Sequence, residues 1–438
     1  MACPDFDVPG SEEPLRSRGR HMSDDETIPF QEIEGETEFV APEVYAANLI
    51  EWAAERRASD LFISDAERSV TVSIRRLGRV EIVRRLARDF GRRLQGHLRA
   101  MSGSDAGEMI RPSEGRGVIT TPGGMEIDLR LSSIPTLFGQ DVAIRLFDPA
   151  HGSRELHELG FDAHELAVIK SLLDRPSGLI LVVGPAGSGK SSTLYAALRY
   201  LNDGSRKIHT LEDPIEHALS GVMQTGINLR AGLDFSDLLP VVLRHSPDVI
   251  MIGEIRDEET AATAVRAGAS GQLVLATLHA KAAAEAVELL MHYGTNAKFL
   301  AAALSGVINQ RLIRCLGPEC SEPLPDESEI SIPDRVAQRL HGQAPVLRRA
   351  KPIEDGPPDG FTSLTCLPEI LRVGEAVSDA IGRGTHAAEL HAMAIEDGMM
   401  PLADAAMLRV IRGITTPAEA TRVVADPRLA DLVAMYRD

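Results

Sequence analysis

Aromatic residues are scarce in this sequence. Phe, Trp and Tyr make up 4% of its 438 residues, and there is a single Trp. Proteins that bind single-stranded nucleic acids stack the bases on aromatic side chains, so the scarcity disfavours such a groove. The charge balance points the same way, because 64 acidic residues outnumber 46 basic ones and give a formal net charge of −18. Nucleic acids need a basic surface, and we therefore expect no nucleic-acid partner.

Cysteines and long apolar runs are also few. The four cysteines are too few and too scattered to indicate a disulfide framework; they are Cys3, Cys315, Cys320 and Cys366. No apolar run approaches the roughly 20 residues that cross a bilayer. The N-terminus is acidic and contains proline, unlike the basic and then apolar start of a signal peptide. These features predict a cytoplasmic protein without a transmembrane segment.

The first third of the chain changes character twice. Residues 1–38 carry eleven Asp and Glu but three Arg, without sustained periodicity, which predicts a disordered acidic tail. Residues 39–147 contain short alternating runs such as Met125–Leu131 and a basic stretch with helical spacing, Ala87–Met101. Strands and helices in about 110 residues predict a small α+β domain. Residues 148–160 are expected to be a linker.

The rest of the chain has the pattern of an α/β fold. Residues 161–318 contain short, nearly all-apolar runs, which suit parallel strands covered by helices on both faces. These runs are Leu179–Val183, Ile208–Leu211, Val249–Ile252 and Leu273–Ala276. We expect Lys281–Leu316 to be mostly helical. Residues 319–438 begin with a Pro-rich stretch and are expected to form a divergent C-terminal subdomain, largely helical from Leu367 to Met435.

A phosphate-binding motif lies between one apolar run and a helical stretch. The segment matches G-x-x-x-x-G-K-[ST] at every fixed position, and we expect the nucleotide to be bound by Gly184, Pro185, Ala186, Gly187, Ser188, Gly189, Lys190, Ser191 and Ser192. Glycines let backbone N–H groups wrap the phosphates at the start of the helix. Lys190 would reach the β- and γ-phosphates, and Ser191 would bind Mg²⁺. The sequence therefore predicts that ATP and Mg²⁺ bind here.

A carboxylate follows the apolar run Val249–Ile252. In a P-loop fold the acid that acts on water or the metal lies at the carboxyl edge of the sheet. An ordinary motif of this kind has Asp just before the acid, whereas this sequence has Gly253. We predict that Glu254 orients the attacking water. Taken alone, Glu254 could equally be a solvated residue at a strand end.

Two further apolar runs end in polar residues. Glu212, Asp213 and Glu216 surround a proline after one run; Glu212 and Asp213 are candidates for holding Mg²⁺ through water, although a polar turn is the plain alternative. His279 follows another run. A lone histidine is more often a packed or capping residue, but its place at the sheet edge makes His279 a candidate γ-phosphate sensor.

The four segments, in this order, resemble the ATPase family of type II secretion and type IV pilus assembly systems. The family's Walker A loop, Asp box, atypical Walker B motif and His box are similar to residues 184–191, 212–216, 248–257 and 271–279. The resemblance implies a RecA-like P-loop NTPase core preceded by a small PAS-like α+β domain. It also implies a hexamer that hydrolyses ATP to drive protein secretion or pilus (pseudopilus) assembly, and an inner-membrane platform protein as partner.

Similarity on both sides of the core adds further expectations. Arg130 and Arg145 match positions that the family uses as arginine fingers, which reach a nucleotide across an interface. From the sequence alone, both would be interpreted as surface cations on strands. The segment Arg412–Thr416 resembles the ending of the secretion and pilus-extension branch. The implied location is the cytoplasm, peripheral to the inner membrane through partners.

Departures from the family leave alternatives open. Gln272 stands where the family commonly has His, and Cys320 matches one zinc ligand whose partner position holds Gly317. A structural zinc takes four ligands, so we predict no zinc. One alternative to the motor is a nucleotide-binding regulatory or scaffold member of the family with weak or no turnover. A nucleic-acid motor is a third, which the net charge disfavours.

Overall fold

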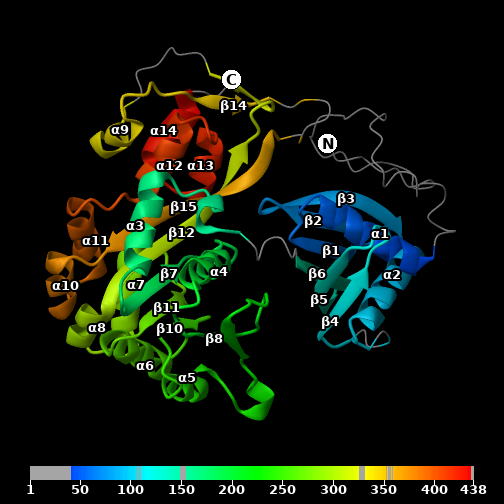
Figure 1. Ribbon diagram of the computed structural model, residues 1–438. Helices are drawn as coiled ribbons and strands as arrows, with labels where there is room; N and C mark the ends of the chain where they lie inside the picture. The colour runs from blue at the N-terminus through cyan, green and yellow to red at the C-terminus, as the bar shows by residue number, and fades with distance from the viewer. Residues whose placement is uncertain are drawn as a thin grey trace. The chain divides into compact units, whose positions relative to one another are not determined.

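The structure is a computed structural model, and it describes residues 41–435 except 106, 108, 109, 148–153, 325–330, 352, 354–356 and 358. The chain forms two compact units (Figure 1). Unit 1 comprises residues 1–151 and 352–360, and unit 2 comprises 152–351 and 361–438. The tail predicted at residues 1–38, Cys3 and part of the expected linker at 148–160 lie outside the described residues.

Unit 1 is an antiparallel sheet with helices α1 and α2 packed on one face (Figure 1). The strand order is β3-β2-β1-β6-β5-β4. The elements are α1 (Pro42–Glu55), β1 (Asp60–Asp65), β2 (Ser69–Arg76), β3 (Arg79–Ala87), α2 (Arg88–Met101), β4 (Ser113–Thr120), β5 (Glu126–Thr136) and β6 (Gly139–Phe147). This arrangement confirms the expected α+β fold. Strand β3 was not anticipated, because its three arginines interrupt the apolar alternation.

Alternation along the strands and helical spacing in α2 form the core of unit 1. Leu61 and Ile63 of β1 are fully buried, and so are Leu94 and Leu98 of α2. Residues two apart on a strand lie on the same face of the sheet, and residues four apart on a helix lie on the same face of the helix. The two sets meet between sheet and helices and form one core.

Unit 2 is built on a seven-stranded sheet of order β15-β12-β7-β11-β10-β8-β9. The strands are β7 (Gly178–Val183), β8 (Ile208–Glu212), β9 (Val222–Gly226), β10 (Val249–Ile252), β11 (Leu273–Leu278), β12 (Leu304–Leu316) and β15 (Phe361–Arg372). Neighbouring strands are parallel except β15, which runs antiparallel to β12. The four apolar runs predicted as parallel strands are thereby confirmed.

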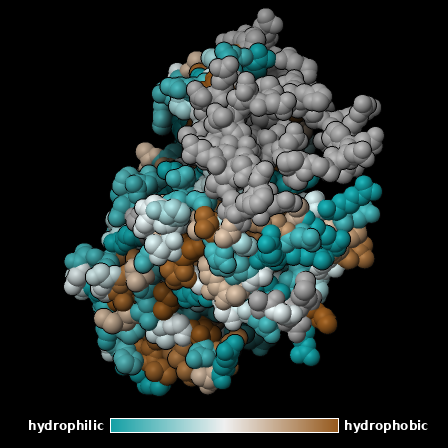
Figure 2. Space-filling view, turned by 90° about the vertical axis from the view of Figure 1, so that its right-hand side faces the viewer, coloured by the Kyte–Doolittle hydropathy of each residue, from teal (hydrophilic) through white to brown (hydrophobic). Residues whose placement is uncertain are grey.

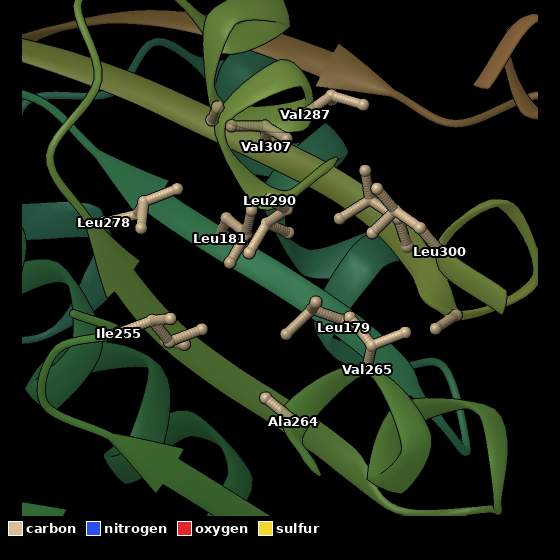
Figure 3. Close-up of a cluster of buried hydrophobic side chains, with 14 of the residues drawn as sticks. Leu179, Leu181, Ile255, Ala264, Val265, Leu278, Val287, Leu290, Leu300 and Val307 are labelled. Carbon is tan, nitrogen blue, oxygen red and sulfur yellow. The ribbon is translucent and has the colours of Figure 1, made fainter. Parts of the chain in front are cut away.

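Helices cover both faces of this sheet (Figure 1). They are α3 (Ala163–Leu173), α4 (Lys190–Leu201), α5 (Phe235–Leu243), α6 (Glu258–Ala269), α7 (Ala283–His292) and α8 (Ala297–Ala303). Figure 3 shows Leu179 and Leu181 of β7 in one cluster with Val265 of α6 and Leu290 of α7. The intervening Ile180 and Val182 belong to the cluster on the opposite face. Alternate residues of a doubly covered strand therefore serve two cores.

Two sequence-based expectations for unit 2 are wrong. Lys281–Leu316 was expected to be mostly helical, yet its last 13 residues form β12. The C-terminal region was expected to be helical from Leu367, but Leu367 lies within strand β15, which extends from Phe361 to Arg372. Buried strands and buried helices cannot be told apart from short apolar runs alone. Here hydrogen bonding of β12 to both β7 and β15 favours the strand.

The remainder of unit 2 is mainly helical. It contains a two-stranded ribbon, β13 (Ser321–Pro323) with β14 (Arg348–Ala350), and the helices α9 (Asp334–Leu340), α10 (Glu375–Gly382), α11 (Ala387–Glu396), α12 (Leu402–Ile411), α13 (Pro417–Val423) and α14 (Pro427–Met435). A buried ion pair, Arg314 to Glu419 at 2.8 Å, joins α13 to β12. In the described part of the chain, the helices are too short or too polar to cross a bilayer.

Candidate active site

The phosphate loop connects the end of β7 to the start of α4 and requires glycine. Gly184, Gly187 and Gly189 have φ values of 146°, 72° and 88°, a region that costs L-residues energy but not glycine. A Cβ atom on Gly184 would also lie 2.5 Å from the carbonyl oxygen of Gln310. The glycines of the motif thus allow both the turn and the close approach of β12.

Lys190 begins α4 and points back into the loop. Its Nζ atom donates to the carbonyl oxygens of Gly184 and Pro185, at 2.9 and 3.0 Å. Burial lowers the pKa of the Lys190 ammonium; the charge of Glu254 opposes this shift, and Arg311 adds to it. The lysine and the carboxylate predicted to orient water are therefore close enough to interact electrostatically.

The loop has capacity for an anion that the protein itself does not satisfy. The Ser188 hydroxyl is buried, and among the described residues it has no hydrogen-bond partner. Lys190 contacts backbone carbonyls in the loop rather than a carboxylate. An unpaired buried donor and a cation at the N-terminus of a helix favour a negatively charged ligand. The residues present therefore fit a bound phosphate chain.

Ser191 and the acidic segment after β8 lie next to each other. The Ser191 hydroxyl donates to Glu216 at 3.4 Å. Glu212 is buried, and its carboxylate accepts hydrogen bonds from Tyr195, from Thr210 at 2.5 Å and from Gln224 at 3.0 Å. Burial and the hydrogen bond to Glu212 raise the pKa of Tyr195. Glu212 is thus fixed by three donors, whereas the carboxylate that reaches Ser191 is that of Glu216.

Glu254 lies two residues after β10, at the carboxyl edge of the sheet. A Cβ atom on Gly253 would lie 3.1 Å from the carbonyl oxygen of Leu211, so a larger residue there would press on the neighbouring strand. The Glu254 carboxylate is 3.0 Å from Nε2 of His279 and accepts a 2.7 Å hydrogen bond from Nε of Arg256. The structure therefore brings together Glu254 and His279, as the chain order alone could not show.

Arg256 connects two of the acidic segments. Its guanidinium group contacts Glu254 and lies 3.4 Å from Asp213, which follows β8. The Thr277 hydroxyl donates to the Gly253 carbonyl, and the N–H of Ile255 donates to the Thr277 carbonyl at 3.0 Å. These bonds hold the ends of β8, β10 and β11 together around the phosphate loop.

Arg130 and Arg145 lie in unit 1, on neighbouring strands. They are paired in register between β5 and β6, and Arg130 is paired in the same way with Arg116 of β4. The Arg145 side chain is largely exposed and lies 3.3 Å from Asp60. Residues opposite each other in a sheet share one face, so unit 1 presents a row of three arginines on the face away from its helices.

Several residues at the site were not singled out from the sequence. Arg256 stands two residues after Glu254, and Glu216 closes the acidic segment, so spacing could have indicated both. Tyr195 and Gln310 could not have been found in this way, because their contacts join positions that lie far apart in sequence. Among the described residues, no group of three or more His, Cys, Asp or Glu is arranged to hold a metal ion. Mg²⁺ needs no such cage, because substrate phosphates supply part of its coordination.

Comparison with known proteins identifies the family of the chain. A family model described as Type II/IV secretion system protein matches residues 35–422. The type IV pilus assembly ATPase PilB of Myxococcus xanthus is 36% identical over 386 residues, which cover 86% of this chain and 67% of that protein. The type II secretion system ATPase E of Vibrio cholerae is 35% identical over 401 residues, covering 91% of this chain and 78% of that protein.

A solved structure shows the same fold. The pilus retraction motor PilT with bound ADP aligns with a TM-score of 0.57 and 22% identity over 87% of this chain and 97% of that one. The RecA-like core and its preceding α+β domain are therefore as expected. Because the family model spans most of the chain and both relatives match along nearly its whole length, this chain belongs to the Type II/IV secretion system protein family and is a P-loop ATPase of that family.

Proposed function

We propose that this protein is a motor that hydrolyses ATP at the loop between β7 and α4 to drive protein secretion or pilus assembly. The observation that supports it most is that the phosphate loop with Lys190, Glu254 and His279 follow the neighbouring parallel strands β7, β10 and β11 at one edge of the sheet. In this role the backbone N–H groups of residues 186–191 and the Lys190 ammonium bind the phosphates. Ser188 supplies a further donor, since its hydroxyl is not used within the described protein.

Magnesium would be held next to Ser191. A hydroxyl and carboxylates are the oxygen ligands that Mg²⁺ prefers, and bound Mg²⁺ would neutralise charge on the phosphates. Glu216 is the carboxylate that contacts Ser191. Glu212, predicted as a Mg²⁺ residue acting through water, can serve in that role while Tyr195, Thr210 and Gln224 fix its orientation. Asp213 remains a further candidate.

Glu254 orients the water that attacks the γ-phosphorus. In-line attack forms the new P–O bond, breaks the bond to ADP and releases phosphate. Arg256 fixes the orientation of the carboxylate from one side. His279 contacts Glu254 from the other side, at 3.0 Å. In this role it senses the γ-phosphate, because the position of the γ-phosphate oxygens affects the contact between His279 and Glu254.

Charge that develops on the γ-phosphoryl group needs cations that the loop alone does not supply. We assign this role to Arg130 and Arg145 acting between subunits of a homo-oligomer, which the family resemblance suggests is a hexamer. Surfaces available for association exist in each unit. Figure 2 shows hydrophobic patches among hydrophilic residues on one face, and large exposed apolar side chains include Ile82 and Phe299, each 58% exposed.

The relatives are named for type II secretion and for type IV pilus assembly. By analogy, this protein would work in the cytoplasm, peripheral to the inner membrane, on a platform protein of one such system. Division of the chain into two compact units would suit a motor whose units move relative to each other during turnover.

Exchange of Glu254 tests the proposal. Glu254→Gln should bind Mg-ATP with nearly unchanged affinity but lower phosphate release by about 10²- to 10⁴-fold, because an amide cannot accept a proton from water. Glu259→Gln, an exposed residue on α6, is the matched control and should keep the wild-type rate. Wild-type turnover in Glu254→Gln would remove the role assigned to this carboxylate. Binding without turnover in the wild-type protein would instead favour a nucleotide-binding scaffold.

A further inference from the structure

Strand β12 extends beyond the end of β7 and continues beside the phosphate loop. Asn309 of β12 is in register with Val183, the last residue of β7. The next residues, Gln310 and Arg311, therefore have the loop as their neighbour instead of a strand. On its other side β12 pairs with β15, where Asn309 lies opposite Glu369. We call the side chains of Asn309, Gln310, Arg311 and Glu369 the β12 junction.

Gln310 connects the junction to the phosphate loop. Its side chain is 1% exposed. The Nε2 atom donates to the carbonyl oxygen of Ser188 at 2.8 Å, and Oε1 accepts from the Thr193 hydroxyl at 2.9 Å. One buried amide thus binds the loop and the first turn of α4 at the same time.

Arg311 connects the junction to the segment that follows His279. Its Nη2 atom donates to the carbonyl oxygen of Lys281 at 2.7 Å. Its Nη1 atom donates to the Gln310 carbonyl at 3.0 Å and to the Asn309 side chain at 2.8 Å, and it lies 3.2 Å from the place of a Cβ atom on Gly184. The guanidinium group therefore lies between the phosphate loop and the end of the His279 segment.

Glu369 connects the junction to two helices. The carboxylate is 3% exposed and accepts from the backbone N–H of Ala283 at 2.8 Å and of Leu402 at 3.4 Å, the first residues of α7 and α12. Asn309 donates both to Glu369 and to the Lys281 carbonyl, at 3.3 and 3.2 Å. A carboxylate is stabilised at helix N-termini, so Glu369 fixes the far side of the segment that Arg311 holds.

We propose that Arg311 is a positioning residue for hydrolysis, which holds the Lys281 carbonyl and thereby keeps His279 against Glu254. The inference rests on the proposed roles of Glu254 and His279. His279 lies two residues from Lys281 and contacts Glu254 from an exposed side chain, so its position depends on how firmly the following backbone is fixed. Displacement of a positioned group by about 1 Å can cost 10²-fold in rate.

The fork geometry of arginine is what the position requires. Three acceptors surround the guanidinium group, namely the carbonyls of Lys281 and Gln310 and the amide of Asn309. A lysine ammonium is a compact charge and cannot reproduce the planar fork. Arg311→Lys should therefore keep part of the positioning function, because lysine can still donate to the Lys281 carbonyl. Arg311→Ala should lose this function entirely.

A double-mutant cycle between Arg311 and His279 tests the inference, with kcat and ATP affinity measured for the full chain. Arg311→Ala should lower kcat by about 10- to 100-fold. Its ATP affinity should stay within about threefold of wild type, and its thermal unfolding midpoint should be unchanged. The kcat of Arg311→Lys should lie between those of the wild-type protein and Arg311→Ala. In a His279→Ala background, Arg311→Ala should change kcat by less than about twofold, because the two residues act through one contact. Arg372→Ala, an exposed arginine at the end of β15, is the matched control.

The other outcomes overturn the inference in distinguishable ways. If the two single effects on kcat multiply in the double variant, Arg311 acts independently of His279. If Arg311→Ala weakens ATP binding or lowers the unfolding midpoint at unchanged kcat, Arg311 stabilises the fold and does not position His279 for hydrolysis. If His279→Ala keeps the wild-type kcat, the role of His279 fails and the inference fails with it. The Glu254→Gln result still decides the proposed function in each case.

Discussion

The carboxylate of Glu254 is held from two sides, by Arg256 and by His279. Arg256 also contacts Asp213, so one guanidinium group joins the ends of β8 and β10. Two nitrogen atoms of Arg256, Nε and Nη2, contact the same oxygen of Glu254 at 2.7 and 2.6 Å, and such charge-assisted contacts hold a carboxylate firmly in place. The adjacent Gly253 keeps the strand ends close, because a Cβ atom there would crowd the backbone of β8.

Removal of the Arg256 side chain should therefore disturb catalysis more than binding. Arg256→Ala is expected to lower kcat by about tenfold to 100-fold, because Glu254 would rotate away from the attacking water. ATP affinity should change little, since the hydrogen bonds and ion pairs of Arg256 among the described residues go to Glu254 and Asp213 and not to the phosphate loop. Steady-state kinetics against Arg383→Ala, an exposed arginine after α10, provide the check. A rise in KM at constant kcat would contradict the assignment.

Among the elements, helix α2 illustrates how closely packing follows the sequence. Gly91 and Gly96 both lie in α2. A Cβ atom on Gly91 would lie 2.4 Å from Val70 of β2, whereas one on Gly96 would meet nothing within 4 Å. Replacement of glycine by alanine should therefore change the free energy of unfolding in opposite directions at these two positions, which are five residues apart.

Gly96→Ala should stabilise unit 1 by about 0.5–1 kcal/mol, because alanine restricts the unfolded chain and favours a helix. Gly91→Ala should destabilise it by about 1–3 kcal/mol through overpacking. Unfolding in urea, with hydrogen exchange of the α2 amides as the probe, gives the change in the free energy of unfolding for both variants. Equal effects of the two substitutions would mean that α2 does not pack on β2 through Gly91.

The ion pair between β12 and α13 predicts an acid-sensitive contact. Burial would raise the pKa of Glu419, but hydrogen bonds from Arg422 and Arg314 outweigh it and lower the pKa to about 2. A carboxyl group whose pKa is lower in the folded than in the unfolded state stabilises the fold above its unfolded pKa. This contribution should therefore be lost as the pH falls from about 4.5 to about 2.

Glu419→Gln should cost roughly 3 kcal/mol at neutral pH, because it removes the negative charge that pairs with the buried Arg314 guanidinium group, and the difference from wild type should shrink below pH about 4. Urea unfolding across this pH range, with the exposed Glu396→Gln as control, measures it. A pH-independent difference would rule out the titration of Glu419 as the cause.

The elements differ in how far the sequence alone predicts them. Strands β7, β8, β10 and β11, and the loop that follows β7, could be predicted because each is a short apolar run with a local motif at its end. Strands β12 and β15 could not, since they are defined by hydrogen bonds to distant partners. The same holds at the site, where Glu254 follows from spacing, but the bond between Thr193 and Gln310, 117 residues apart, depends on the strand order.

At the scale of the whole molecule, the residues assigned to ATP hydrolysis are divided between the two compact units of the chain. The phosphate loop, Glu254 and His279 belong to unit 2, whereas Arg130 and Arg145 belong to unit 1. If these arginines act between subunits, an active site is completed by two chains. A chain without Arg130 and Arg145 and a chain without Lys190 could then form an intact site together.

Mixing variants tests this sharing. Arg130→Ala/Arg145→Ala protein and Lys190→Ala protein should each be nearly inactive, because one lacks the cations that stabilise the transition state and the other lacks the phosphate-binding lysine. Mixed oligomers should regain a measurable fraction of the wild-type rate, since some sites combine intact parts of both. Phosphate release from mixtures that never exceeds the sum of the separate rates would contradict arginine fingers acting in trans.

The most direct measurement is steady-state phosphate release from Mg-ATP by the wild-type protein and by Lys190→Ala, with the exposed Lys298→Ala as control. Wild-type and Lys298→Ala proteins should turn over at the same rate, and Lys190→Ala should be slower by at least about 100-fold, because its ammonium no longer meets the phosphates. Equal rates for all three proteins would place ATP hydrolysis somewhere other than the loop between β7 and α4.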